Sequence, residues 1–415
     1  MKKIFVAVSV LYATGAFAGE PVDSVRTFDL QNVLVTATRA VSDLNQNQIQ
    51  KLNFGQDIPQ LLSLTPSVIF TSDAGNGIGY TSMRVRGSDP SRINVTANGI
   101  PVNDAESSTV FWVNMGDFAS SLQSLQIQRG VGTSTNGSGA FGATLNMQTE
   151  DIGAKPFIGL DMAGGSYASH KETLRFGTGL LGGHWGIQGR LSNIGSDGYL
   201  ERASTDLNSY FIQAGYFSDN TMVKFLTFNG TERTYHAWNY ASKYEQNLYG
   251  RRYNSCGEYY DAEGNVHYYD GQTDNYHQQN YQLHLNQIID DNWNFTATLH
   301  YTKGAGYYEE YKGSRTWGEY DLTTDWNVLG DLVRQKKMAN DFYGAVASLS
   351  YENKKGLSAH LGGGWNLYDG DHFGKVIWTG APYIMVPDGN GKDVAEYIQT
   401  PADLQPNHTY YDNNT

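Results

Sequence analysis

Apolar and polar side chains alternate over stretches of about ten residues from residue 155 onward, and this pattern restricts the possible fold more than any other feature. In one stretch every second residue is apolar, and the positions between are polar: Trp293, Phe295, Ala297, Leu299 and Tyr301 alternate with Asn294, Thr296, Thr298, His300 and Thr302. A period of two is that of a β-strand whose two faces meet different surroundings.

The alternation predicts nine strands, at residues 156–164, 172–180, 184–194, 208–217, 221–229, 279–288, 293–303, 341–351 and 357–368. Short turns are expected at 181–183, 218–220 and 290–292, and long connections at about 230–278, 304–340 and 369–415. Strands of this kind suit a lipid-facing barrel with short periplasmic turns and long outer loops. A soluble β-sandwich alternates in the same way, so the pattern alone leaves both architectures open.

Composition excludes some classes of protein. Mean hydropathy is -0.48, and no long apolar segment follows the N-terminus, which excludes a helical membrane protein. The 29 Tyr and 47 Gly fit a barrel with aromatic girdles and tight turns, although a secreted soluble β-protein would share them. A net charge of -13 argues against a nucleic-acid partner.

The N-terminus has the features of a secretory signal peptide. A basic start at Lys2 and Lys3 leads into a short apolar run, which ends at Ala16-Phe17-Ala18. This order is typical of an export signal and is too short for a membrane-spanning helix. Residues 1–18 are therefore predicted to be a signal peptide, and the mature chain to leave the cytoplasm.

No catalytic or metal site stands out from the sequence. Cys256 is the single cysteine, so it cannot form an internal disulfide, and it is predicted as a lone thiol in a loop. Residues 261–265 lack the spacing and the terminal glutamate of an EF-hand, and no Cys/His cluster has zinc-ligand spacing. The sequence therefore predicts no metal, no cofactor and no enzyme.

Residues 46–152 are predicted to form a mixed α/β globule. Residues 57–64 are expected to be a short helix, with Asp57 as its N-cap and Pro59 in its first turn. Its leucines, Leu61, Leu62 and Leu64, would face a core. Short strands are expected at 68–70 and 93–95, followed by a tight hairpin turn at Asn98-Gly99.

Within this globule, four short β-like blocks are closed by glycine. They are Met83–Gly87, Asn98–Asp104, Gln128–Ser134 and Gly139–Met147. Together they resemble the plug domain of TonB-dependent outer-membrane receptors. Later stretches are similar to the Bacteroidetes branch of that family: Ser196–Tyr199, Glu232–Asn239 and Tyr301–Tyr308.

The resemblance implies a mainly β fold, in which a transmembrane antiparallel β-barrel follows a small mixed α/β plug. The implied order is a signal peptide at 1–18, a flexible segment at 19–45, the plug at 46–152 and the first part of the barrel at 153–415. A plugged barrel of this kind needs about 22 strands. Since residues 153–415 supply only nine or ten, we expect a truncated barrel and an incomplete chain.

The family imports scarce ligands across the outer membrane with energy supplied by a TonB-type periplasmic protein. The segment resembling its coupling site is Val33, Leu34, Val35, Thr36, Ala37 and Thr38. An extended segment of this composition suits strand addition by a partner, although it also suits an ordinary first strand of the plug. A ferric siderophore or another iron complex is the default ligand, and cobalamin, haem and glycans remain alternatives.

Two unrelated functions stay open. A secreted or outer-membrane adhesin that recognises a surface glycan would need no coupling segment. A hydrolase on a β-scaffold would need catalytic acids in its loops, and none can be singled out.

The residues that match the plug motif are expected to be structural: Arg84, Arg86, Gly87, Asn98, Gly99, Arg129, Gly130 and Gly142. The three arginines are expected to pair with carboxylates of the barrel wall, because buried arginines need such partners, and an anion-binding role is the alternative. The chain departs from the family pattern at Asn98, Gln126 and Val131, where Asp, an acidic residue and Pro are more usual.

The resemblance places the ligand site on the extracellular side, between plug loops and barrel loops. The matching candidates are Asn76, Tyr80, Phe111, Trp112, His236 and Trp238, with Tyr307 and Tyr308 as weaker ones. Glycine-rich loops flanked by aromatic side chains suit an aromatic-lined pocket. Packing against the barrel wall is the alternative for Phe111 and Trp112.

Overall fold

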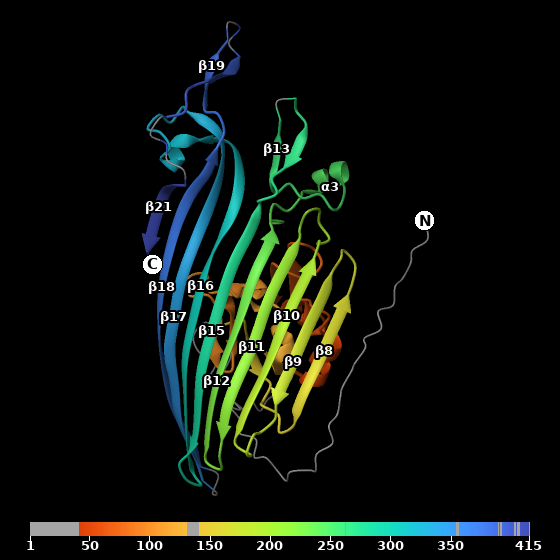
Figure 1. The fold of residues 1–415 in the computed structure, drawn as a ribbon, viewed down its shortest axis with the longest axis vertical. Helices are drawn as coiled ribbons and strands as arrows, with labels where there is room; N and C mark the ends of the chain where they lie inside the picture. Colours follow the sequence, from red (N-terminus) through yellow and green to blue (C-terminus); the bar gives the residue numbers. More distant parts are fainter. Residues whose placement is uncertain are drawn as a thin grey trace, which may run out of the picture.

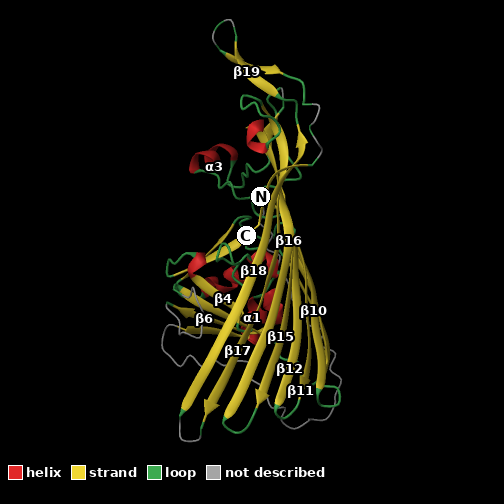
Figure 2. Cartoon of the chain, turned by 90° about the vertical axis from the view of Figure 1, so that its left-hand side faces the viewer, coloured by secondary structure: helices red, strands yellow, loops and turns green. Residues whose placement is uncertain are grey.

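A small mixed α/β plug lies on the concave side of a large antiparallel sheet (Figures 1 and 2). The computed structural model describes residues 41–130, 141–261, 263–353, 357–388, 390, 392–401, 404 and 407–414. The predicted signal peptide, the coupling segment at 33–38 and part of the third and fourth plug blocks lie outside these residues. Within them, no helix is long and apolar enough to cross a membrane.

The large sheet contains all nine predicted strands in sequence order. They are β8 Pro156–Gly164, β9 His170–Thr178, β10 Trp185–Ser196, β11 Thr205–Phe217, β12 Thr221–Tyr235, β15 Thr273–Ile288, β16 Trp293–Thr316, β17 Leu329–Glu352 and β18 Ser358–Thr379. Each pairs antiparallel with the next, from β8 to β18. The predicted mainly β fold is confirmed.

The strands from β12 to β18 run further into the outer region than the alternation predicted. The expected loop at 304–340 is mostly strand, since β16 continues to Thr316 and β17 begins at Leu329. In this part polar residues face each other across the pairing, as Glu310 does with Arg334, so no apolar alternation marks it. Backbone pairing thus continues where the sequence pattern stops.

Smaller elements lie at or near this outer end of the sheet (Figure 1). They are α3 Lys243–Tyr249, β13 Glu258–Tyr260, β14 Val266–Tyr268, η6 Trp317–Tyr320, β19 Tyr383–Pro387, β20 Asp393–Tyr397 and β21 His408–Asn414. Cys256 lies in the loop before β13, as predicted, but it is fully buried, and burial raises the pKa of its thiol.

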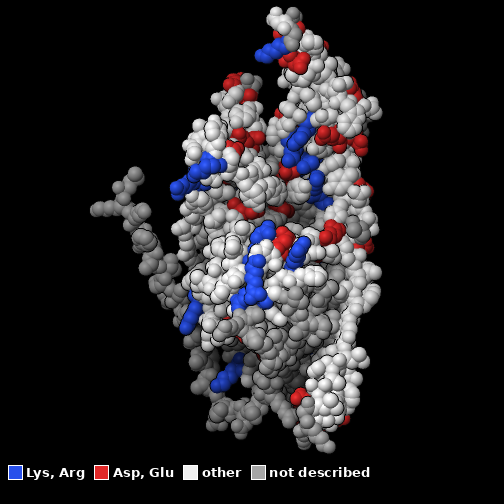
Figure 3. Space-filling model, turned by 180° about the vertical axis from the view of Figure 1, so that it is seen from behind, with Lys and Arg blue, Asp and Glu red and all other residues white. Residues whose placement is uncertain are grey.

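The two faces of the large sheet have the polarity of a membrane barrel. On β10 the outward residues Trp185, Ile187 and Leu191 are exposed, whereas the inward Gln188, Arg190 and Ser192 are buried. A soluble sandwich buries its apolar face instead. Seen from the side of the plug, acidic and basic side chains gather over the plug and the outer part of the sheet (Figure 3). Apolar groups outside and polar groups inside therefore favour lipid contact over the sandwich alternative.

Aromatic side chains border the apolar outer band. Trp293 stacks near Tyr351 at 4.8 Å between ring centroids, and Tyr301 lies parallel to Tyr281 at 5.9 Å. Trp293 and Tyr301 are eight residues apart on β16, which corresponds to ~26 Å at ~3.3 Å per residue. This separation is close to the ~25 Å apolar band of outer-membrane barrels.

The plug is built on a five-stranded sheet with the order β1-β6-β7-β4-β5 and a separate β2-β3 hairpin. Its strands are β1 Val41–Asn45, β2 Val68–Ser72, β3 Thr81–Val85, β4 Ile93–Ala97, β5 Ile100–Pro101, β6 Leu122–Arg129 and β7 Ala143–Thr149. Its helical turns are α1 Gln46–Leu52, α2 Ile58–Leu61, η1 Leu62–Leu64, η2 Pro90–Arg92, η3 Trp112–Met115 and η4 Phe118–Ser121. The sequence did not predict α1, which is held by a capping box between Asn45 and Gln48.

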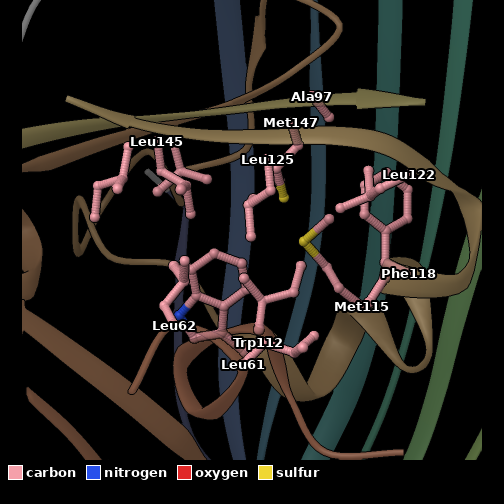
Figure 4. Packing of buried hydrophobic residues seen from close by; sticks show 14 of the residues in the cluster. Leu61, Leu62, Ala97, Trp112, Met115, Phe118, Leu122, Leu125, Leu145 and Met147 are labelled. Atoms are coloured by element: carbon pink, nitrogen blue, oxygen red, sulfur yellow. The ribbon is translucent and has the colours of Figure 1, made fainter. Parts of the chain in front are cut away.

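A single apolar core joins these elements (Figure 4). Leu61 and Leu62 point into it as predicted, but Leu64 is 82% exposed, so its predicted burial is wrong. The helix turns into a 3-10 turn at Leu62, and this change of period moves Leu64 away from the core. Phe118 reaches the barrel strand β12, where its ring lies 4.8 Å from that of Phe228.

Turn chemistry supports the plug as predicted. Asn98 and Gly99 join β4 to β5 with φ angles of 54° and 81°, the left-handed pair of a two-residue hairpin. The Asn98 side chain also accepts the backbone N–H of Thr149 at 3.0 Å. At Gly142 a Cβ would lie 2.5 Å from that of Ser88, so no larger residue fits without displacing the neighbouring loop.

A charged side chain placed in the outer apolar band should destabilise the protein in lipid. Leu283 is 42% exposed, pairs with Leu299 and lies in the band between the aromatic borders. Leu283→Arg should destabilise the protein in lipid vesicles by ~2–4 kcal/mol in urea titrations. Leu248→Arg is the control, because Leu248 on α3 is 58% exposed but lies outside the band. Equal effects of the two substitutions would contradict lipid contact.

Candidate functional site

The plug is held to the barrel by a buried carboxylate. Asp117 lies 3.0 Å from the Lys171 ammonium of β9 and 3.8 Å from the Arg190 guanidinium of β10, with its side chain fully buried. The hydroxyls of Thr173 and Ser192 donate to it at 2.6 and 2.7 Å. Burial alone raises the pKa of Asp117, but Lys171 and Arg190 outweigh burial and hold the pKa well below its usual value.

A second plug acid makes a similar contact. Glu150 pairs with Arg175 of β9 at 3.1 Å and accepts the Gln188 amide of β10 at 2.8 Å. Burial raises the pKa of Glu150, although Arg175 acts in the opposite direction. Acids of the plug thus meet bases of the first barrel strands.

This polarity is the reverse of the prediction for the plug arginines. Arg84 is half-exposed and pairs with Asp89 of the plug itself at 3.4 Å. Arg129 donates to the Ser42 hydroxyl at 2.8 Å, which is also a plug contact, and Arg86 is exposed. The expected pairing of Arg84 with a barrel carboxylate is therefore wrong. Among the described residues, the acids that pair across the interface belong to the plug: Asp117, Glu150, Asp151 with Lys224 at 3.9 Å, and Glu106 with His372 at 2.8 Å.

At its outer end the plug contacts the barrel through hydrogen bonds to carboxylates. The Tyr80 hydroxyl donates to Asp274 of β15 and lies 3.3 Å from Glu232 of β12. The Tyr240 hydroxyl of an outer loop donates to Asp73 at 2.9 Å. Burial and the two nearby carboxylates raise the pKa of Tyr80, so its hydroxyl keeps its proton.

A cavity of about 780 Å³ opens beside these contacts, between the outer loops of the plug and the barrel wall. The plug contributes Tyr80, the segment 101–105 and Phe111, and the barrel contributes side chains of β12 and β15 to β18. Its aromatic lining consists of Tyr80, Phe111, Phe228, Trp238, Tyr276, Tyr307, Tyr308, Phe342, Tyr368 and Tyr411. The volume suits a ligand of several hundred daltons.

Three of the six predicted ligand residues, Tyr80, Phe111 and Trp238, line this cavity. Trp112 packs in the plug core at 4% exposure, which is the alternative considered for it. His236 is buried and stacks on Trp238 at 3.8 Å. Asn76 lies elsewhere and donates to Ser196 of β10 at 2.7 Å. A ligand-binding role for these residues stays a prediction.

The polar side of the cavity was not predicted. It contains Asp104, Glu232, Asp274, Glu310, Lys336, Lys337 and His372. A signal for part of it existed, because the inward phase of β15, set by Gln282 and His284, extends back to Tyr276 and Asp274. Among the described residues, no group of three or more His, Cys, Asp or Glu side chains is placed to hold a metal ion.

Removing the Asp117 charge should loosen the plug. Asp117→Asn leaves Lys171 and Arg190 buried without their counter-charge, which typically costs ~3–5 kcal/mol. Amide hydrogen exchange in η4 and β6 of the intact protein should speed up accordingly. Arg84→Gln, which breaks an exposed pair, should change exchange little. Unchanged exchange in Asp117→Asn would show that this carboxylate does not anchor the plug.

Asp57 should make the plug sensitive to pH. It is buried and accepts the Thr81 hydroxyl at 2.8 Å, and burial raises its pKa to about 8. The folded plug therefore keeps a proton that the unfolded chain releases above about pH 4, so stability falls as pH rises from about 4 to about 8.

Asp57→Asn should remove this loss, because the amide stays neutral and still accepts from Thr81. We expect slower hydrogen exchange in β2 and β3 at pH 7, equivalent to roughly 1–3 kcal/mol, and no difference near pH 4. A variant that exchanges faster at pH 7 would refute the assignment of a buried neutral carboxyl.

Comparisons with known proteins agree with this architecture. The family model described as TonB-dependent receptor plug domain matches residues 33–144. The ferric enterobactin receptor of Pseudomonas aeruginosa is 25% identical over 226 residues, which cover 49% of this chain and 29% of that receptor.

Two solved structures share the fold. The ferric citrate transporter in its unliganded form has a TM-score of 0.62 and 15% identity, over 86% of this chain and 51% of that chain. The ferric preacinetobactin receptor of Acinetobacter baumannii has a TM-score of 0.59 and 13% identity, over 90% and 52%. The chain thus spans about half the length of these structures. The chain carries a plug domain of the TonB-dependent receptor type, and its inward-polar antiparallel sheet shares the fold of outer-membrane receptor barrels.

Proposed function

We propose that the protein binds an iron complex such as a ferric siderophore at its outer face and imports it with energy from a TonB-type periplasmic protein. The observation that carries this proposal is the aromatic-lined cavity of about 780 Å³ between plug and barrel. The names of similar proteins support the ligand class, since they include receptors for ferric enterobactin and ferric preacinetobactin and a ferric citrate transporter.

The cavity suits a ligand that both parts of the molecule must hold. Tyr80 and Phe111 come from the plug, whereas Trp238 and Tyr308 come from the barrel side. Trp238 lies edge-on to Tyr80 at 6.4 Å and to Tyr308 at 5.8 Å, so these rings form one continuous aromatic wall. A bound ligand would therefore change contacts between plug and barrel as well as its own.

The organisation that we propose is a plug at 46–152 and barrel strands at 153–415, preceded by a tether that carries the coupling segment at 33–38. In the structure β1 adds to the plug sheet at its edge, and β6 is its one partner among the described strands. An edge strand of five residues is the part of the sheet that is easiest to peel away. Force applied to residues 33–38 would thus reach the plug through β1.

Deleting residues 33–38 tests the coupling role. Uptake of the radiolabelled ferric complex by cells should fall to the level of a strain without the receptor, while binding to the same cells should persist. A matched control deletes six residues of the predicted flexible segment nearer its start, at 21–26, and should retain uptake.

The alternatives give other results. Uptake that survives the 33–38 deletion would contradict the coupling role, and an adhesin would show binding without uptake in every variant. A haem, cobalamin or glycan receptor would bind its own ligand and not the ferric complex. A hydrolase would convert its ligand, and turnover would disappear with single alanine substitutions of loop acids.

A further inference from the structure

Two carboxylates at the cavity have no cationic partner. Glu232 of β12 is 3% exposed, and Asp274 of β15 is half-buried next to it. Both share the hydroxyl of Tyr80, which is neutral. Among the ion pairs of the described residues, none involves either acid. Buried acids without a counter-charge are costly, and burial together with the neighbouring Asp274 raises the pKa of Glu232, so a cation at this part of the cavity wall would stabilise the charged form.

The third acid of the barrel wall is different. Glu310 of β16 lies 2.7 Å from the Arg334 guanidinium and 2.9 Å from the Lys312 ammonium, so its charge is already compensated. Bases are therefore present in this region of the barrel and pair with Glu310. Glu232 and Asp274 nevertheless have no ion-pair partner among the described residues.

A second, independent observation points to a ligand at the same place. Asn114 of η3 also lines the cavity and is 5% exposed, and its side-chain oxygen has no hydrogen-bond partner among the described residues. A Cβ on Gly230 would lie 2.0 Å from the backbone carbonyl oxygen of Asn114, so η3 packs directly against β12 at Gly230. Gly230 is two residues before Glu232 on the same strand. An unsatisfied buried acceptor costs ~1–3 kcal/mol unless a donor reaches it.

The chemistry of these groups selects an organic ammonium. An ammonium carries three N–H donors, and the site offers two carboxylates and an amide oxygen as acceptors. Trp238 and Tyr80 border the carboxylates, and aromatic rings also attract such cations. A small metal ion would require more oxygen ligands at short distance than the two acids supply.

A base lies further along the same inner face. Lys336 of β17 lines the cavity, and its ammonium lies 5.9 Å from the Tyr308 ring centroid. Tyr308 pairs with Asp274 on one side and with Lys336 on the other, so it separates the lysine from the acid pair. One ligand in this space therefore meets a cation at one end and carboxylates at the other.

We propose that the cavity binds a ligand with a protonated amine, which Glu232 and Asp274 receive, while its anionic part faces Lys336. The inference rests on the proposed function, since it takes the cavity as the ligand site, and it adds the charge pattern of the ligand. The amine is the new element, because the iron complex by itself does not require one.

Simple organic ions test the amine site without any iron complex. The probes are hexylammonium, hexanoate and hexanol, which share one chain and differ in charge. The receptor purified from outer membranes would be labelled with 5-fluorotryptophan, and Trp238→Phe would assign the Trp238 fluorine resonance. Hexylammonium should shift this resonance in a saturable way at millimolar concentration, at least about tenfold below the concentration at which hexanol does so.

Substitutions of the two acids test whether Glu232 and Asp274 bind the ammonium group. Glu232→Gln combined with Asp274→Asn should weaken hexylammonium binding at least tenfold, because both charge-assisted contacts are lost. Each amide still accepts a hydrogen bond from Tyr80, and trypsin resistance of the plug checks the fold. If the double variant fails this check, the single variants decide, with an expected loss of about threefold or more each.

Asp206→Asn removes an exposed acid of β11 and should leave binding unchanged. An equal shift by hexanol, hexanoate binding that weakens in the same acid variants, or unchanged hexylammonium binding in the folded acid variants would overturn the amine site. Neither result affects the uptake experiment on residues 33–38, so failure of this inference is distinguishable from failure of the proposed function.

Discussion

The buried charge on Asp117 is the interaction on which the relation between plug and barrel depends. A carboxylate removed from water needs compensation on all sides, and here Lys171, Arg190 and two hydroxyls supply it from β9 and β10. Its backbone is left-handed, with φ 51°, which an aspartate tolerates better than most residues. The position, chemistry and backbone of this single residue therefore fix the plug against the first barrel strands.

The sheet has apolar side chains on its outer face and polar side chains on its inner face, and this arrangement explains why the plug makes such a contact. Since the outer face of the barrel strands is apolar, their polar side chains turn inward, and whatever fills the interior must satisfy them. Lys171, Gln188, Arg190 and Lys224 are all buried on this inner face. A plug with an apolar surface would leave them without partners. The plug instead presents Asp117 and Glu150 to β9 and β10, while its apolar core continues into the barrel side chains Phe211 and Phe228.

Much of this architecture was accessible from the sequence, because it depends on local patterns. Alternation located nine strands, and Asn98-Gly99 predicted the hairpin between β4 and β5. Pairing between distant segments was not accessible. No local signal connects Asp117 with Lys171, and the plug arginines were more conspicuous than the acids that make the contact. The acid pair of Glu232 and Asp274 likewise forms only when β12 and β15 become neighbours.

The contacts between plug and barrel are unevenly distributed around the interface. Charged pairs with high cost of disruption lie at β9 and β10, through Asp117 and Glu150. At β12 and β15 the contacts are more varied. Asp151 lies 3.9 Å from the Lys224 ammonium, Gln282 donates to the Ala97 carbonyl oxygen at 3.3 Å, and the Tyr80 hydroxyl is shared between two acids. The cavity lies on this second side. A ligand group that competes for Glu232 and Asp274 would therefore weaken the Tyr80 contact, while the ionic contacts at β9 and β10 keep the plug in register.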